Sequence, residues 1–231
     1  MKYKIFILED HPIMRRGYRT LINGEMDIEV CGEAETAAEA LEKIPQVDPD
    51  LVIADISLEG TNGIEFVKRL QTEKPGLEVL IVSMHEESLY AERALQAGAV
   101  GYVMKKEADN SVLTAIRRVQ GGRYYVSERM QDKIMLLFAG QTSPKELAEK
   151  TPSITQLSDR ELEVFELHGR GLTTLEMAES MRISPKTIAT YRGRIKTKLA
   201  IETMPELVRR AVLWIENEKR SANGTDRRTN G

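Results

Sequence analysis

The sequence has a single cysteine and no long apolar segment, and both absences exclude classes of protein. The lone thiol of Cys31 cannot form an internal disulfide, which excludes a small scaffold held together by disulfides. No apolar run approaches the roughly 18 residues of a membrane span, and Lys2 and Lys4 interrupt the first apolar run, so no secretory leader is expected. The composition therefore predicts a soluble, cytoplasmic protein without a membrane partner.

Acidic side chains are absent from residues 182–198, a stretch that holds six lysines and arginines. Residues 1–126 hold 21 acidic and 15 basic side chains, whereas residues 127–231 hold 15 and 18. A one-sign cluster on one element indicates a polyanionic partner, although a solvated helix face would explain the cluster equally well if it stood alone. The length of 231 residues indicates two domains, at roughly 100 to 200 residues each.

Short apolar segments alternate with helical patterns over the first 120 or so residues. The patterns predict strands over 3–8, 28–33, 51–54, 77–82 and 100–104. Helices are expected at about 12–24, 37–44, 63–73, 86–97 and 108–119, with Pro45 and Pro49 breaking the chain after the second one. Five strands that alternate with five helices predict an α/β fold built on a doubly wound, five-stranded parallel sheet.

Polar side chains stand at the ends of several of these strands. Residues 51–63, LVIADISLEGTNG, deliver Asp55 to the end of an apolar run. The other strand ends carry Glu9 and Asp10 after the first strand, Ser83 after the fourth and Lys105 after the fifth. Because the C-terminal ends of parallel strands lie along one edge of the sheet, these side chains are expected to converge there.

Three carboxylates at one edge supply only oxygen ligands, and such a set suits Mg²⁺. With the metal neutralising their charge, Asp55 could attack a phosphoryl donor while Ser83 and Lys105 bind the phosphoryl oxygens. The alternative left open by spacing alone is an acidic strand edge beside a surface lysine, with no chemistry.

Residues 123–153 lose the regular alternation and are predicted to be a linker. Its one helical stretch, at 127–139, belongs either to the linker or to the first core. The segment 218–231 is polar and without periodicity, so we expect it to be disordered.

Helical starts with clear caps follow the linker, at Ser158, Thr173, Ser184 and Thr203. The helix at 174–181 is joined by only RIS to the basic helix that begins at Pro185. This spacing matches a helix-turn-helix, whose second helix enters the major groove of DNA. The second domain is therefore expected to be small and all-α.

The first 120 or so residues resemble the flavodoxin-like receiver domain of bacterial two-component response regulators. The matching residues are Glu9, Asp10, Asp55, Gly63, Ser83, Gly101, Tyr102 and Lys105. The resemblance implies that Asp55 is the phosphoacceptor and that Ser83 and Lys105 contact the phosphoryl group. It further implies Mg²⁺ bound by Glu9, Asp10, Asp55 and the backbone carbonyl of Ser57.

The same resemblance assigns a switch and two tuning positions. Ser83 and Tyr102 would form the switch, with Tyr102 turning inward on phosphorylation, although ordinary strand packing explains Tyr102 equally well. Ser57 and His85 stand two residues beyond Asp55 and Ser83, where family members tune the lifetime of the phosphate.

Residues 155–215 resemble the LuxR-type DNA-binding domain in Leu157, Glu161, Gly171, the EMA at 176–178, the IS at 183–184, Thr187, Ile188, Lys198 and Leu199. Both halves together resemble the NarL/FixJ class of transcriptional regulators. The implied boundaries are a receiver at 1–122, a linker at 123–153 and a DNA-binding domain at 154–217. DNA contacts are expected from Lys186, Thr187, Ala189, Thr190, Arg192, Gly193, Arg194 and Lys196.

Some positions depart from the family pattern. Leu58 and Glu59 stand where Met-Pro is common, and Lys106 follows Lys105 where many receivers have proline. Tyr191 replaces the usual histidine of the recognition helix, so base readout is expected to rest more on methyl contacts.

The class implies a response regulator rather than an enzyme, with only self-phosphorylation from a phosphodonor and autodephosphorylation at Asp55. A sensor histidine kinase would phosphorylate Asp55, and the active homodimer would bind a pseudo-palindromic operator in double-stranded DNA, with RNA polymerase as a further partner. The apolar stripe at 207–215 would pack on its own domain or partly on a second subunit.

Two other classes of protein share part of this pattern. The first is a phosphate-independent DNA-binding regulator with an atypical receiver. The second is an aspartate-nucleophile phosphotransferase acting on small molecules. Such hydrolases typically place a second acid two residues after the nucleophile, where this chain has Ser57.

Overall fold

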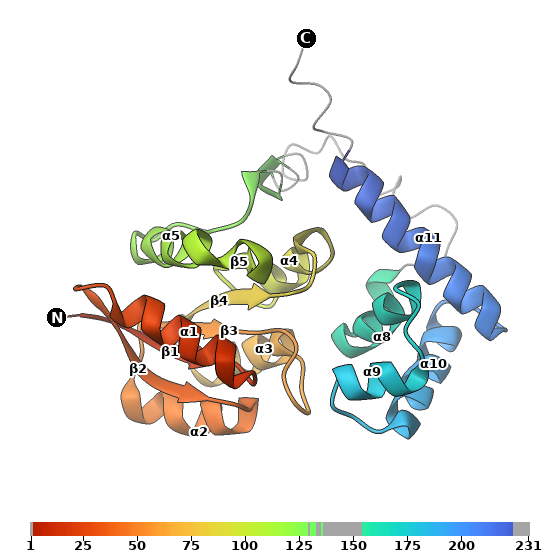
Figure 1. Cartoon of the computed structure of the whole chain (residues 1–231), viewed down its shortest axis with the longest axis horizontal. Helices are drawn as coiled ribbons and strands as arrows, with labels where there is room; N and C mark the ends of the chain where they lie inside the picture. The colour runs from red at the N-terminus through yellow and green to blue at the C-terminus, as the bar shows by residue number, and fades with distance from the viewer. Residues whose placement is uncertain (1, 129, 133–134, 136–153, 224–231) are drawn as a thin grey trace, which may run out of the picture. The chain divides into compact units, whose positions relative to one another are not determined.

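The computed structural model describes residues 2–128, 130–132, 135 and 154–223. It divides into two compact units, Met1–Met135 and Leu136–Gly231, shown along the chain in Figure 1. No helix among the described residues is long and apolar enough to cross a membrane.

The first unit is a five-stranded sheet in which every pairing is parallel and the strand order is β2-β1-β3-β4-β5. The strands are β1 (Tyr3–Leu8), β2 (Ile28–Ala34), β3 (Leu51–Ala54), β4 (Glu78–Ser83) and β5 (Gly101–Met104). The crossover helices are α1 (Pro12–Asn23), α2 (Ala37–Val47), α3 (Gly63–Glu73), α4 (Glu87–Gln96) and α5 (Ala108–Gln120). The predicted doubly wound parallel sheet is confirmed.

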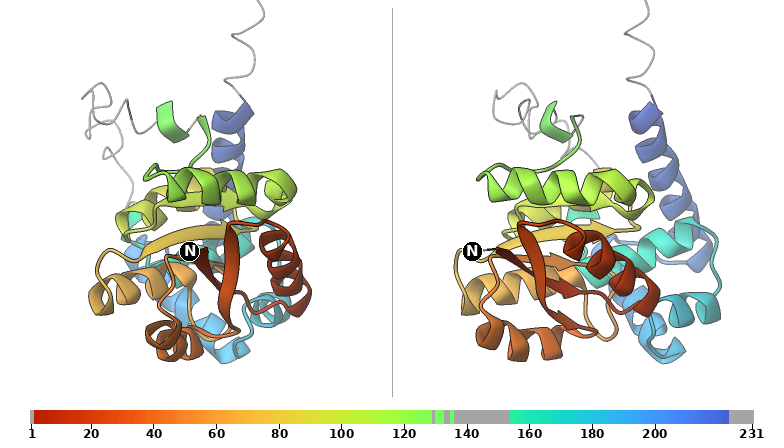
Figure 2. Two further views of the ribbon diagram at one scale, coloured as in Figure 1. Left: turned by 90° about the vertical axis from the view of Figure 1, so that its left-hand side faces the viewer. Right: turned by 60° about the vertical axis from the view of Figure 1, so that its left-hand side comes forward.

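Helices cover both faces of this sheet (Figure 2). On one face, Ile5 and Ile7 of β1 pack with Ile22 of α1 and Ile116 of α5 in one buried cluster. Since side chains alternate between the faces of a strand, the equally buried Phe6 faces the other side. Both faces of the central strands are therefore apolar, as their uninterrupted sequences require.

The predicted break at Pro45 is wrong, because α2 continues through this residue to Val47. A proline in the last turn of a helix removes only one backbone donor, so the helix can finish around it. Its end is set by Asp48, which adopts a left-handed conformation (φ 46°) and donates its N–H to the carbonyl oxygen of Ile44 at 3.0 Å.

The described part of the second unit starts with a 3₁₀ turn (Ile154–Gln156) and has four helices: α8 (Asp159–Gly169), α9 (Thr174–Ser180), α10 (Pro185–Lys198) and α11 (Met204–Asn223). Ser158 and Thr173 each form a complete reciprocal capping box. The α9–α10 turn includes Arg182 in a left-handed conformation (φ 50°). The predicted helix-turn-helix arrangement is thus present.

The apolar stripe of α11 packs within its own unit. Leu207, Ala211 and Ile215 are buried, and the ring of Trp214 lies 5.6 Å from that of Phe165 on α8. A Cβ added to Gly169 of α8 would lie 2.5 Å from the backbone oxygen of Ala211, so these helices approach too closely for a larger residue. Most of the apolar stripe is therefore buried in the core of its own unit.

The disorder predicted from residue 218 is wrong for 218–223, because α11 continues to Asn223. Glutamate, lysine, arginine and alanine all favour helix, and a helix that is already nucleated by packing extends at little cost. The remainder of that prediction, 224–231, lies outside the described residues.

Candidate functional site

The ends of β1, β3 and β5 bring four charged side chains together. β3 is buried along its whole length and carries Asp55 to the sheet edge, where the Asp55 N–H donates to the carbonyl oxygen of Leu8 at 3.0 Å. Glu9, Asp10 and Asp55 are 1%, 6% and 3% exposed. Lys105, which follows β5, is also buried. The predicted convergence at one edge is therefore observed.

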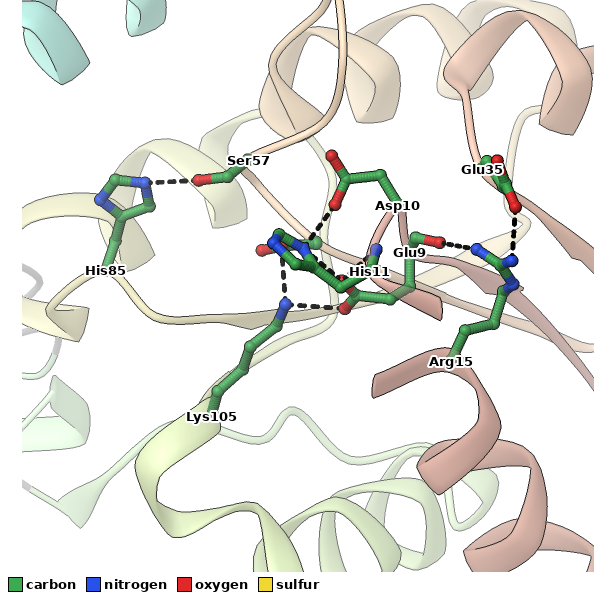
Figure 3. A network of polar contacts seen from close by, with 9 residues as sticks. Glu9, Asp10, His11, Arg15, Glu35, Ser57, His85 and Lys105 are labelled. Atoms are coloured by element: carbon green, nitrogen blue, oxygen red, sulfur yellow. Dashed lines mark hydrogen bonds and ion pairs between the residues drawn. The ribbon is translucent and has the colours of Figure 1, made fainter. Parts of the chain in front are cut away.

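Lys105 bridges two of the carboxylates (Figure 3). Its Nζ donates to Glu9 Oε2 at 2.7 Å and to Asp55 Oδ2 at 2.7 Å. Burial, followed by the charge of Asp55, raises the pKa of Glu9. Burial alone would lower the pKa of Lys105, but the two carboxylates outweigh burial and the pKa is raised. The ammonium is thus charged and held where it can meet a further anion.

The acidic cluster could hold a metal ion. One ligand atom from each of Glu9, Asp10, His11 and Asp55 lies within 4.8 Å of the others. Asp55 Oδ1 is buried and has no hydrogen-bond partner among the described residues. An unpaired carboxylate oxygen is costly to bury, so this atom fits an incoming cation. Oxygen-rich sites of this kind suit a hard divalent ion.

His11 is a member of this cluster that sequence reasoning missed. Its Nδ1 lies 2.6 Å from Asp10 Oδ1 and 3.3 Å from Glu9 Oε1. The available signal was its position directly after the acid pair, where it becomes the N-cap of α1. On the next turn, Arg15 donates to the carbonyl oxygen of Glu9 at 2.7 Å and fixes the backbone of the acid pair (Figure 3).

The predicted switch and tuning residues are joined in one hydrogen-bond network. His85 Nε2 lies 2.9 Å from the Ser57 hydroxyl, and the His85 N–H donates to Ser83 Oγ at 3.3 Å. The hydroxyl of Tyr102 donates to the carbonyl oxygen of His85 at 2.9 Å. Tyr102 is 1% exposed, so its ring already points inward in this structure. His85 lies at the centre of this network, and its isolated position in the sequence did not reveal that role.

Gly63 lets the loop after β3 fold back against Asp55. Its N–H donates to the carbonyl oxygen of Ile56 at 2.8 Å, and an added Cβ would lie 2.0 Å from the Asp55 backbone oxygen.

We expect Gly63→Ala to lower the free energy of unfolding by about 3 kcal/mol, because the backbone around Asp55 must move to admit the added methyl group. Urea unfolding measures this. Gly17→Ala, at an open position in α1, is the control and should be neutral or stabilising; equal effects would contradict the expectation.

The residues predicted to contact DNA lie on α10, but they are not equally available. Lys186, Ala189, Thr190, Gly193 and Arg194 are exposed, whereas Thr187, Arg192 and Lys196 are half-buried. The N–H of Thr187 is bonded to the cap at Ser184.

Arg192 is held by α8. Its Nε donates to His168 Nε2 at 2.8 Å, so the imidazole must be neutral at that atom. Burial and the charge of Arg192 lower the pKa of His168 to about 4, which keeps the acceptor available at neutral pH. The sequence gives no signal for this contact, because it joins side chains on two different helices that are 24 residues apart along the chain.

Comparisons with known proteins match both units. Residues 5–117 match the response regulator receiver domain, and residues 155–211 match the luxR family of bacterial regulatory proteins. The oxygen regulatory protein NreC of Staphylococcus aureus is 32% identical over 210 residues, which is 90% of this chain and 96% of that protein. Among solved structures, a LuxR-family two-component response regulator from Aurantimonas sp. is similar with a TM-score of 0.56 and 33% identity, over 60% of this chain and 99% of that one.

A second solved structure spans both units. The RcsB response regulator of Salmonella typhimurium, in a structure described as showing conformational dynamism for DNA interaction, has a TM-score of 0.52 and 25% identity, over 92% of this chain and 98% of that one. Together with the matches of both units, these relatives identify the chain as a two-component response regulator that joins a receiver domain to a LuxR-type DNA-binding domain and acts in transcription regulation.

Proposed function

We propose that a partner histidine kinase phosphorylates Asp55 and that this modification controls homodimer formation and DNA binding. The observation that carries the proposal is the Asp55 carboxylate itself. It is buried, one oxygen is bound by Lys105 at 2.7 Å, and the other has no hydrogen-bond partner among the described residues. The protein's place is the cytoplasm, where a kinase, DNA and RNA polymerase are all accessible.

The residues of the pocket have distinct roles in this proposal. Glu9, Asp10, Asp55 and the backbone carbonyl of Ser57 would hold Mg²⁺, which supplies positive charge against the phosphoryl oxygens when bound. Asp55 attacks the phosphorus atom, and the Asp55–phosphorus bond forms as the bond to the donor breaks. The Lys105 ammonium donates a hydrogen bond to one phosphoryl oxygen, and the buried Ser83 hydroxyl donates to another.

Intact-mass measurement tests the acceptor directly. The protein is incubated with Mg²⁺ and a small phosphoryl donor, and peptide mapping locates any adduct. We expect one phosphoryl group per chain, on Asp55. An adduct on another residue, or none, would overturn the proposed role of Asp55. A control incubation with a chelator should abolish the adduct, because the carboxylates would then repel the donor.

His85 is expected to slow loss of the phosphoryl group. Its ring bonds to Ser57 at 2.9 Å, two residues from Asp55, and packs 4.5 Å from the ring of Tyr90, so it restricts the approach of water. We expect His85→Ala to speed dephosphorylation about tenfold, equivalent to about 1.4 kcal/mol in the barrier. Decay of the adduct is followed by mass. Met84→Ala, at an exposed neighbour, should leave the rate unchanged; an unchanged rate in His85→Ala would remove His85 from this role.

Arg194 is the most direct test of the DNA face, because it is exposed on α10. If it neutralises one phosphate, Arg194→Ala should weaken binding to all sequences and reduce the slope of log affinity against log salt by about 1. The measurement is a salt titration by fluorescence anisotropy. Arg69→Ala, at a receiver residue that pairs with Glu73, should not alter the slope. An unchanged slope in Arg194→Ala would place the contact elsewhere.

A further inference from the structure

The segment that follows α5 lies along the outer edge of β5. Tyr125 pairs with Gly101 in parallel; the Tyr102 N–H donates to the Tyr125 carbonyl oxygen at 2.8 Å, and the Tyr125 N–H donates to that of Val100 at 3.1 Å. β5 is the last strand in the sheet order, and an uncovered edge would leave these backbone groups unpaired. A Cβ at Gly101 would lie 2.7 Å from the Tyr125 oxygen, so the close approach requires glycine.

The same segment is fastened to α4 by Glu87. One oxygen of the Glu87 carboxylate accepts the Ser127 N–H at 2.8 Å, and the other accepts the Ser127 hydroxyl. Ser127 Oγ in turn accepts the N–H of Met130 at 3.2 Å, and Val126 and Met130 are buried. Glu87 is 8% exposed, and a buried carboxylate persists only where donors such as these satisfy it.

This attachment is continuous with the pocket of Asp55. Ser83, at the pocket, accepts the His85 N–H, and the His85 carbonyl oxygen accepts the Tyr102 hydroxyl. Tyr102 then donates its backbone N–H to Tyr125, which lies two residues before Ser127. These bonds form a continuous path along which a movement of Ser83 towards a phosphoryl group would act on the segment.

We propose that Glu87 is a positioning residue that clamps residues 124–128 to α4 and β5, and that phosphorylation of Asp55 alters this clamp and through it the DNA-binding activity of the chain. The inference rests on the proposed phosphorylation of Asp55. Coupling through this network means that the clamp and the pocket bias one another. Coupling of this kind is reciprocal.

Hydrogen exchange measured by mass spectrometry on the full chain tests the clamp, with and without Mg²⁺ and the phosphoryl mimic beryllium fluoride. In the natural protein, we expect exchange of the amides at 124–128 to change on the order of fivefold when the mimic is added. In Glu87→Ala, the same amides should exchange fast in both conditions. Glu87→Gln keeps an acceptor for the N–H and offers a donor to the hydroxyl oxygen, so it should restore both the protection and the response.

Two further variants complete the design. Glu86→Ala removes a neighbouring exposed carboxylate that pairs with Lys106, and it should behave as the natural protein. Ser127→Ala removes the hydroxyl bond to Glu87 and the acceptor of the Met130 N–H, but it keeps the backbone bond from Ser127 to Glu87. It is therefore the milder test if Glu87→Ala does not fold. A normal response of 124–128 in either Glu87→Ala or Ser127→Ala would overturn the clamp, provided that 83–87 also respond. If no segment of the natural protein responds to the mimic, the proposed phosphorylation fails and the clamp's role in transmission fails with it.

Discussion

Asp55→Asn is expected to acquire no phosphoryl group and to bind DNA with one affinity, whether or not a phosphoryl donor is present. The amide nitrogen and oxygen that replace the carboxylate are poor nucleophiles, and the Lys105 ammonium loses one of its two charged partners. Allosteric couplings are typically about 5- to 150-fold in affinity, and the natural protein should show a response in that range. The comparison is made by mass and by fluorescence anisotropy on the same preparations.

The matched control is Glu73→Gln, which removes the charge of an exposed carboxylate that pairs with Arg69 at 2.7 Å. It should keep both the adduct and the response. A full response of Asp55→Asn to the donor would show that another group receives the phosphoryl or that the donor acts without one.

Lys105→Met is expected to have the second large effect. It removes the cation between Glu9 and Asp55 and leaves their buried charges facing each other. Removing one partner of a buried ion pair typically costs about 3 to 5 kcal/mol, and we expect a loss of about 3 kcal/mol in urea unfolding without metal. Any adduct that forms should not change DNA affinity, since the contact from Lys105 to the phosphoryl group is missing.

Lys106→Met is the matched control for Lys105→Met. It also removes one lysine charge, but at an exposed residue that pairs with Glu86 at 3.3 Å. A surface pair of this kind contributes about 0 to 1 kcal/mol, so little change in stability is expected. If Lys105→Met were as stable and as responsive as Lys106→Met, the ammonium of Lys105 would have no role in the switch.

Sequence reasoning predicted the sheet and the convergence at its edge because both follow from local rules. Apolar runs of strand length alternate with capped helices, and parallel strands must place Asp55 and Lys105 at the same edge. The contacts that sequence reasoning missed join residues far apart along the chain. Ser127 and Glu87 are 40 residues apart, and His168 and Arg192 are 24 apart.

Those pairings depend on how loops and helices pack, which periodicity does not encode. The two errors fall at helix ends. Pro45 predicts a break, but it removes only one backbone donor in the last turn of α2, which runs to Val47. Polar composition predicts disorder from residue 218, but the helix-favouring residues there let α11 extend to Asn223. Chemistry placed at strand ends was thus easier to predict than contacts between loops.

The most direct test of the central claim is the DNA affinity of the natural protein, measured at one salt concentration with and without Mg²⁺ and beryllium fluoride. Sites selected from a random library in the presence of the mimic supply the DNA. The proposed switch predicts at least about tenfold tighter binding with the mimic, which corresponds to about 1.4 kcal/mol. Equal affinity in both conditions would contradict control by Asp55 and favour a regulator that acts on DNA without phosphate.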